Sequence, residues 1–160
     1  MIDIGPYAHA DHRTTVDLVL DIQTREFGVP VTYDQQPDLQ DPAAFFRRGA
    51  GEFWVARDAG DVVGTAGLVE FAPGEGALRK MFVRADRRGA EYGVAQRLLD
   101  TLLAHARAQG LARVWLGTTE FFKAAHRFYA KNGFAVIGEA ALPPAFPRMK
   151  PDTRFYRIDL

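Results

Sequence analysis

The sequence predicts one α/β (α+β) domain in which a mixed, mostly antiparallel sheet is flanked by helices. Residues 52–83 contain three strand-like runs joined by short turns, a pattern typical of an antiparallel meander. Residues 76–137 then read as strand, helix, strand, helix and strand, and such a succession requires crossovers and parallel pairing. The length of 160 residues is that of a single domain, so we expect residues 1–160 to form one unit.

The first third of the chain predicts a strand, a helix and a loop. Residues 2–7 read as a short strand, and residues 11–27 as a helix with Asp11 at its N-cap. Residues 29–42 carry three prolines and three aspartates without periodicity, which favours a surface loop. A short helix is compatible with "AAFFRR" at residues 43–48.

The remaining elements follow from changes in periodicity. The segment "DAGD" at residues 58–61 predicts a hairpin turn, and "GALRKMFV" at residues 76–83 predicts the third strand of the meander. A broad apolar face predicts a helix from residue 94 that Gly110 ends. Residues 111–117 predict a strand, residues 120–133 a helix, residues 134–138 a strand, and residues 153–160 a last strand that returns antiparallel.

Composition excludes several classes of function. Lys and Arg total 20, as do Asp and Glu, so no overall positive charge favours nucleic acid. The chain has no cysteine, and its four histidines lack ligand spacing, so we expect no metal site. The N-terminus lacks a charged leader followed by an apolar run, and no stretch of 18 apolar residues occurs. We therefore expect a soluble cytoplasmic protein with no membrane or nucleic-acid partner.

The stretch "VRADRRGAEYGVAQRLL" at residues 83–99 predicts an anion site. Unpaired N–H groups and the positive end of the dipole attract an anion to the beginning of a helix. Arg87 and Arg88 add charge before the helix, and Gly89 and Gly93 allow close approach of the main chain. This pattern favours a phosphate or diphosphate ligand, although a solvated turn is the alternative interpretation.

Four segments in order resemble one known family. They are "LRKMFVRADRRG", "GVAQRLL", "GLARVWLGT" and "AAHRFYAKNGF". Together they resemble the GNAT superfamily of acetyl-CoA-dependent N-acetyltransferases, and the resemblance covers roughly residues 52–137. It implies the GNAT fold, in which a pair of parallel strands splays apart. It also implies acetyl-CoA as the acetyl donor, bound in the V-shaped opening between them.

The resemblance further implies cofactor contacts. In this family the pantetheine arm pairs with the strand before the charged turn, here through the main chain of Met81 and Val83, with an oxyanion donor near Phe82. The residues implied to hold the diphosphate are Arg88, Gly89, Gly93, Val94 and Ala95. Relative to the usual spacing of the family, Glu91 and Tyr92 resemble a two-residue insertion. Glu91 would repel a diphosphate unless it turned outward or paired with an arginine.

The resemblance also suggests catalytic residues. Tyr129 matches the tyrosine that donates a proton to the departing sulfur, although it could instead pack with Phe122 and Phe128. A general base is not obvious, because Arg79 and Lys80 lie where many relatives carry a glutamate. Glu70 is our candidate, with Glu120 as another, and each could equally be a solvated carboxylate. Thr118 and Thr119 occupy the zone where the family often has an asparagine.

The sequence also suggests an acceptor site and a function. Tyr33, Asp34 and Asp38 would suit a cationic amine, with a solvated acidic loop as the alternative. We expect an N-acetyltransferase that passes the acetyl group directly to an amine of a small molecule or peptide. A non-enzymatic acyl-CoA sensor or partner-binding module is the alternative, and a nucleotide-binding protein is a third. Exposed sheet edges leave a homodimer open.

Overall fold

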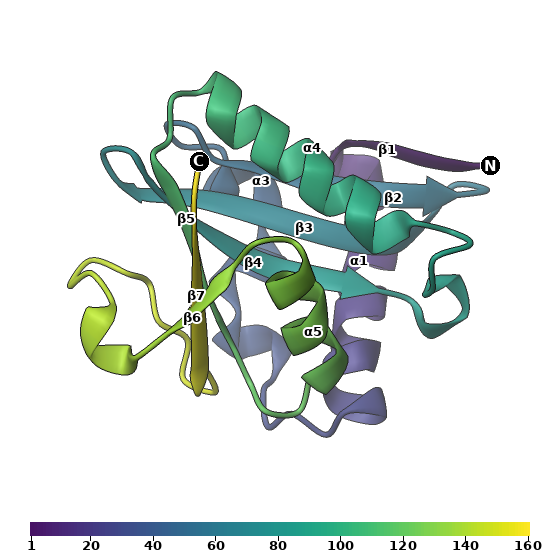
Figure 1. The fold of residues 1–160 in the computed structure, drawn as a ribbon. Helices are drawn as coiled ribbons and strands as arrows, with labels where there is room; N and C mark the ends of the chain where they lie inside the picture. Colours follow the sequence, from purple (N-terminus) through teal and green to yellow (C-terminus); the bar gives the residue numbers. More distant parts are fainter.

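A seven-stranded sheet forms the centre of the protein, with strand order β1-β2-β3-β4-β5-β7-β6 (Figure 1). The computed structural model describes all residues 1–160. The strands are β1 (Ile2–Pro6), β2 (Glu52–Asp58), β3 (Asp61–Ala72), β4 (Glu75–Val83), β5 (Arg113–Thr118), β6 (Ala135–Ile137) and β7 (Arg154–Asp159). The helices are α1 (His12–Leu20), α2 (Pro37–Gln40), α3 (Pro42–Phe46), α4 (Val94–Ala108) and α5 (Lys123–Lys131).

Strands β2, β3 and β4 form the predicted antiparallel meander. Their first turn places Ala59 and Gly60 at φ 51° and 86°, the left-handed conformation that a tight two-residue hairpin requires. Asp58 pairs with Asp61 across this turn, so the residues of "DAGD" adopt the predicted hairpin.

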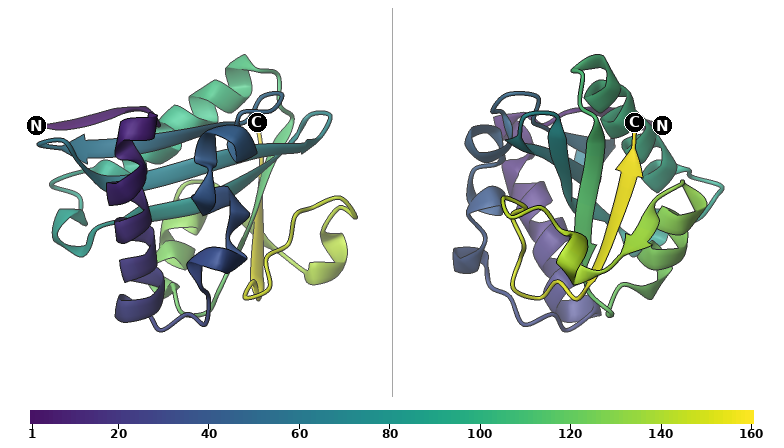
Figure 2. Two further views of the ribbon diagram at one scale, coloured as in Figure 1. Left: turned by 180° about the vertical axis from the view of Figure 1, so that it is seen from behind. Right: turned by 60° about the vertical axis from the view of Figure 1, so that its left-hand side comes forward.

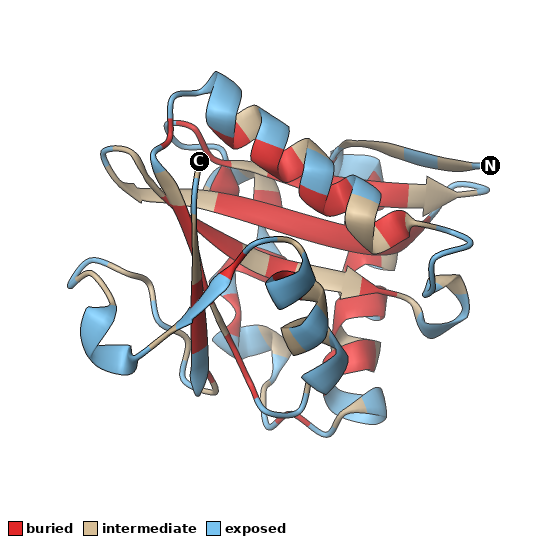
Figure 3. Cartoon of the chain, viewed as in Figure 1, coloured by how far each residue is buried: buried red, intermediate tan, exposed pale blue.

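Helices cover both faces of the sheet. Figures 1 and 2 show α4 and α5 over one face and α1, α2 and α3 over the other. Leu98, Leu99 and Leu102 of α4 are fully buried in the larger of two core clusters. The smaller cluster joins α1 and α3 to the opposite face, because Leu18 and Phe46 pack with Phe53 and Val55 of β2 and with Val62 of β3. Figure 3 shows the corresponding pattern, with buried residues along β3 and the inner side of α4.

The parallel pair β4 and β5 is short. Only Glu75, Gly76 and Ala77 of β4 pair with β5, at Arg113, Val114 and Trp115. Beyond Ala77 the two strands separate, while β5 continues to pair with β7 as far as Thr118. The predicted fold class, a mixed sheet with a splayed parallel pair, is therefore confirmed.

Three local predictions need correction. Asp11 occupies the N-cap position of α1 but does not cap it, because its carboxylate accepts from the Ala8 N–H and binds Arg57. The predicted loop at residues 29–42 contains a 3₁₀ turn and α2, and α3 begins at its last residue, Pro42. The last strand of the succession, β6, was expected to pair in parallel, but it lies at the sheet edge and pairs only with β7, antiparallel, because β7 inserts between β6 and β5.

The helix that begins as α1 changes its hydrogen bonding before it ends. It continues from Asp21 to Glu26 as a π-helix, and the Thr24 hydroxyl donates to the Leu20 carbonyl at 2.7 Å. Irregular turns of this kind re-aim side chains and are frequent at functional sites. Here the turn directs Gln23 and Phe27 toward the space between β4 and β5. No helix in the protein is both long enough and apolar enough to cross a membrane.

Candidate functional site

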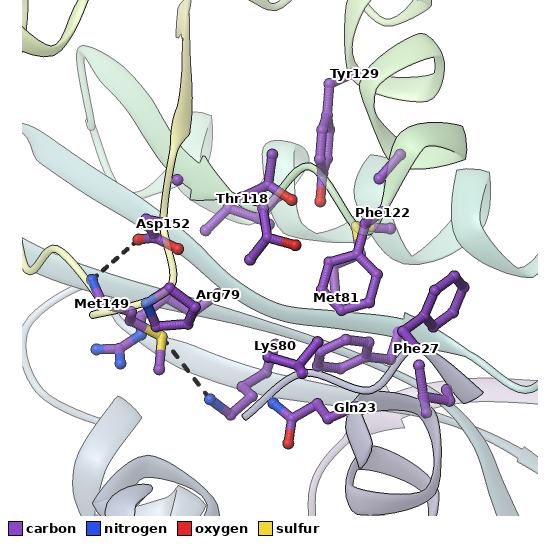
Figure 4. A pocket seen from close by; sticks show the side chains of 18 of the residues that line it. Gln23, Phe27, Arg79, Lys80, Met81, Thr118, Phe122, Tyr129, Met149 and Asp152 are labelled. Atoms are coloured by element: carbon purple, nitrogen blue, oxygen red, sulfur yellow. Dashed lines mark hydrogen bonds between the residues drawn. The ribbon is translucent and has the colours of Figure 1, made fainter. Parts of the chain in front are cut away.

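A cavity of about 350 Å³ occupies the opening between the splayed strands. It extends from the N-terminus of α4, where Arg88 and Ala95 line it, to the loop before β7, where Met149 and Asp152 line it. Most of its walls are apolar. Figure 4 shows Phe27 and Asp152 on opposite sides of this space, with Tyr129 above and Lys80 below.

A bulge in β4 forms the floor of the cavity. Thr65 of β3 pairs with Phe82 and Gly67 pairs with Arg79, so β4 carries one extra residue in this interval. Lys80 adopts a left-handed φ of 54°, and its carbonyl accepts from the Thr65 hydroxyl at 2.6 Å. Bulges redirect backbone groups out of the ladder. Met81, Phe82 and Val83, the predicted main-chain contacts, all line the cavity beside this bulge.

The N-terminus of α4 provides unpaired amides at one end of the cavity. The N–H groups of Val94, Ala95 and Gln96 have no acceptor in the chain, whereas the Arg97 N–H donates to the Gly93 carbonyl at 3.0 Å. Gly93 precedes the helix with φ 62°, and its own N–H is used by the Gly89 carbonyl. Gly93 therefore shapes the turn, while the next three residues offer the donors that an anion requires.

Arg88 is engaged within the chain. Its guanidinium makes two contacts with the Glu26 carboxylate, at 2.5 and 2.8 Å, and its Nε donates to the Val83 carbonyl at 2.8 Å. The same guanidinium lies over the ring of Phe27. These contacts join the charged turn to the end of the first helix, and a bound anion would compete with Glu26 for Arg88.

The two-residue insertion points away from the cavity. Glu91 and Tyr92 line a separate shallow hollow together with Asp58, Arg87 and the N-terminal strand. The Arg87 guanidinium lies over the Tyr92 ring at 5.5 Å and binds Asp58 at 2.8 Å. The Glu91 charge is therefore turned outward, as a diphosphate at the helix would require.

Tyr129 of α5 presents its hydroxyl to the cavity (Figure 4). The ring packs with Phe128, Phe134 and Tyr156, yet the hydroxyl makes no hydrogen bond within the chain. Burial raises the pKa of Tyr129 well above its ordinary value, with Tyr156 adding to the effect. The phenol is therefore protonated at neutral pH and free to donate.

Buried charges lie on the floor beneath the bulge. Lys80 Nζ lies 3.0 Å from Asp38 Oδ2, and Arg79 Nη2 lies 3.3 Å from the same oxygen. Burial lowers the pKa of Lys80, although Asp38 opposes this effect. Asp38, predicted as an acceptor ligand, is itself fully buried beneath the wall and does not line the cavity.

Asp152 is the only acidic residue that lines the cavity. Its Oδ2 accepts from the Met149 N–H at 3.0 Å, which closes a turn before β7. Burial raises the pKa of Asp152, while that N–H and the cations of Arg79, Arg148 and Lys80 lower it. No motif in the sequence points to this residue, because it follows a proline-rich loop outside the region of resemblance.

Several predicted residues lie elsewhere. Glu70 is absent from the cavity lining, and its carboxylate accepts from the Ala50 N–H at 2.8 Å. Tyr33 contacts His12 at 3.5 Å, and Asp34 and Glu120 are exposed, so none of these three lines the cavity either. Thr118 and Thr119 do line it. The structure thus offers no support for Glu70 as a base or for Tyr33 and Asp34 as acceptor ligands.

Comparison with known proteins agrees with this geometry. The sequence model of the Acetyltransferase (GNAT) family matches residues 16–134. The chain belongs to the GNAT acetyltransferase family. A GNAT acetyltransferase of Staphylococcus aureus Mu50 has a TM-score of 0.95 and 32% identity, with 99% of both chains covered. An acetyltransferase of Streptococcus agalactiae has a TM-score of 0.94 and 26% identity, covering 99% of this chain and 98% of that one.

Sequence relatives in this GNAT family match a shorter segment. An uncharacterized N-acetyltransferase of Mycobacterium tuberculosis is 37% identical over 83 residues, which cover 52% of each chain. An IAA acetyltransferase of Azospirillum brasilense is 37% identical over 87 residues, covering 54% of this chain and 56% of that one. The matched segment of this chain spans about half the length of these curated relatives.

Proposed function

We propose that the protein transfers an acetyl group from acetyl-CoA directly to an amine acceptor. The observation that supports this most strongly is the continuous path from the unpaired amides of Val94 and Ala95, along the bulged strand, to the free hydroxyl of Tyr129. A path of this kind suits a ligand with an anionic end and a narrow, amide-bearing arm. The absence of cysteine fits direct transfer, since no thiol nucleophile is present.

The residues fit the donor in three places. The main chain of Met81, Phe82 and Val83 would pair with the pantetheine, because β5 no longer occupies that edge of β4. The amides of Val94 and Ala95 would hold the diphosphate, with Gln96 as a third donor that the sequence did not indicate. Gly89 and Gly93 would shape the turn, and Arg88 would contribute after releasing Glu26. A GNAT-fold protein of Thermoplasma acidophilum, the PaiA N-acetyltransferase, is known in complex with coenzyme A.

Tyr129 would act as the general acid. The thioester supplies an activated acetyl carbon and a sulfur leaving group. The Tyr129 hydroxyl is protonated and without a partner, so it can donate to the sulfur as the C–S bond breaks. A main-chain amide near Phe82 would stabilise the oxyanion, because the bulge turns backbone groups toward the cavity.

The apolar walls favour an acceptor with an apolar body. Phe27, Phe122, Phe146 and Met149 contribute side chains to the cavity, and burying such a body would exclude water from the reacting groups. We propose a primary amine of a small molecule or a peptide as the acceptor.

We also propose that two copies of the chain form a homodimer, which light scattering would test.

The acyl-CoA sensor is the second candidate, and the missing glutamate on β4 favours it. Incubation of the protein with acetyl-CoA and an amine panel, with detection of the free thiol, separates the two functions. The proposed transferase releases CoA together with an acetylated amine identified by mass spectrometry. Binding of acetyl-CoA without release across the panel would instead favour the sensor.

A further inference from the structure

The carboxylate of Asp152 lies at one end of the cavity, next to a glycine that leaves space for it. Asp152 approaches β5 at Gly117, where a Cβ atom would lie only 2.4 Å from Asp152 Oδ2. The backbone of Gly117 is not left-handed, so its conformation does not require glycine. Glycine is needed there because a side chain would not fit. A side chain at residue 117 would displace the carboxylate from its place beside Thr118.

The turn that carries Asp152 is fixed from several sides. The Asp152 N–H donates to the Met149 carbonyl at 3.0 Å, and Oδ2 accepts from the Met149 N–H at the same distance. The next residue, Thr153, donates its N–H to the Thr118 carbonyl at 2.9 Å. Only Oδ2 accepts a hydrogen bond within the chain, which leaves Oδ1 available to a ligand.

Burial and nearby cations act on the pKa of Asp152 in opposite directions. Asp152 is 7% exposed, and burial raises its pKa. Arg79 and Lys80 face it from β4, Arg148 comes from its own loop, and these cations limit the rise. Asp38 of α2 neutralises part of the charge on Arg79 and Lys80. Gly117 of β5 adds no charge. The net effect raises the pKa of Asp152 above its ordinary value, which makes the carboxylate a better proton acceptor.

We propose that Asp152 binds the acceptor ammonium and acts as the general base of the transfer. This inference rests on the proposed function. Asp152 enters the cavity from the loop before β7, whereas Arg88 and Ala95, where the diphosphate would bind, line it at the N-terminus of α4, so an acceptor could enter without crossing the donor. The substrate class is a primary amine that is protonated in solution and carries an apolar body.

The proton and electron balance is simple. The acceptor ammonium gives one proton to Asp152, and its lone pair forms the C–N bond with the acetyl carbon. The C–S electron pair moves to sulfur, which takes the Tyr129 proton. The second proton lost by nitrogen restores the phenol through water, and Asp152 releases its proton to solvent.

The test compares wild type with Asp152→Asn, an isosteric change, using the most active amine of a panel that includes phenethylamine and tryptamine. We expect kcat to fall roughly 100-fold or more, with the acidic limb of the kcat/KM profile lost. The Kd for CoA, measured by calorimetry, should be unchanged. Asp159→Asn, which alters an exposed acid of β7, is the matched control and should keep full activity. Gly117→Ala should also lower kcat, because it displaces the carboxylate without removing it.

The outcomes separate the two proposals. An Asp152→Asn protein that keeps kcat within threefold, or keeps the acidic limb, overturns the role of Asp152 and leaves the acetyltransferase intact. A wild-type protein that binds CoA but acetylates no amine in the panel overturns the proposed function, and this inference with it. If Asp152→Asn does not fold, Gly117→Ala decides by the same kinetic readouts.

Discussion

Lys80 Nζ lies 3.0 Å from Asp38 Oδ2, and the two side chains are 2% and 0% exposed. Arg79 shares the same carboxylate oxygen at 3.3 Å. One buried anion thus holds two cations directly beneath the bulge that shapes the cavity floor. Removing one partner of a buried ion pair leaves an uncompensated charge, which is far more destabilising than replacing the pair by apolar groups.

We therefore expect Asp38→Asn to lower the free energy of unfolding by about 3–5 kcal/mol. Lys80→Met is the comparison, because it leaves the Arg79–Asp38 contact in place and puts an apolar side chain in the buried position. The free energy of unfolding should fall less than half as much in Lys80→Met as in Asp38→Asn. Urea denaturation measures both, and equal losses in the two variants would contradict the shared role of Asp38.

Replacement of Tyr129 by Phe tests the proposed general acid. Because the hydroxyl has no partner in the chain, its removal should leave stability nearly unchanged while kcat falls roughly 100-fold or more. Steady-state kinetics and thermal melting give the two quantities. Tyr156→Phe is the control, since this neighbouring hydroxyl accepts from Arg154 Nε within the chain. Comparable kcat values for the Tyr129→Phe and wild-type proteins would remove the acid role.

The unpaired amide of Ala95 is tested by Ala95→Pro. Proline is tolerated in the first turn of a helix, where it removes an N–H that has no intrahelical acceptor. A hydrogen bond to a charged group contributes about 1.5–3 kcal/mol, so its loss should weaken CoA binding by roughly 10-fold or more. Calorimetry measures the Kd. The KM for S-acetylpantetheine, which lacks the diphosphate, should not change, and a parallel rise in that KM would point to a distorted helix instead.

Glu26 competes with a bound anion for Arg88, so Glu26→Gln should strengthen CoA binding. We expect the Kd to fall several-fold at low salt and the gain to shrink as salt screens the charges. Glu91→Gln removes an exposed carboxylate on the far side of the turn and serves as the matched control. A weaker affinity in Glu26→Gln would show that the Arg88–Glu26 pair organises the site rather than blocking it.

The pair Asp11 and Arg57 predicts a pH dependence of stability. The hydrogen bonds that Arg57 donates to Asp11 lower the pKa of Asp11 below its value in the unfolded chain, although burial opposes this lowering. The stabilisation is therefore complete above about pH 5 and is lost as pH falls through the folded pKa. Asp11→Asn should lower the free energy of unfolding by roughly 1–3 kcal/mol at pH 7, with the difference from wild type narrowing in acid.

Denaturation at several pH values checks this prediction. Asp3→Asn provides the control, because Asp3 is exposed and contacts Arg57 only at 3.4 Å, so its removal should have little effect at any pH. A difference between Asp11→Asn and wild type that stayed constant down to pH 2 would contradict the ionic origin.

Local patterns predicted the fold well where local physics decides it. The alternation in β2 to β4, the turn at Ala59 and Gly60, and the leucine-rich face of α4 each depend on a few neighbouring residues. The insertion of β7 between β5 and β6 was not predictable, because strand order depends on long-range packing. The π-helical turn at residues 21–26 has no periodic signature of its own.

The same distinction applies to the site. Tyr129 and Ala95 lie within motifs, so the sequence singled them out, and both line the cavity. Asp152 comes from a distant, proline-rich loop, and only the tertiary fold brings it to Gly117. Tyr33 and Asp34 were chosen for charge and loop position alone, and neither property fixes which way a loop faces. Arg88 lines the cavity, but its pairing with Glu26 could be seen only in the structure.

A crystal structure of the protein with CoA would show directly whether the cofactor occupies the cavity. We expect diphosphate oxygens within hydrogen-bond distance of the Val94 and Ala95 amides, the pantetheine along Met81 to Val83, and the thiol beside Tyr129. CoA bound at another surface, or density for the diphosphate in the hollow beside Tyr92 instead, would contradict it.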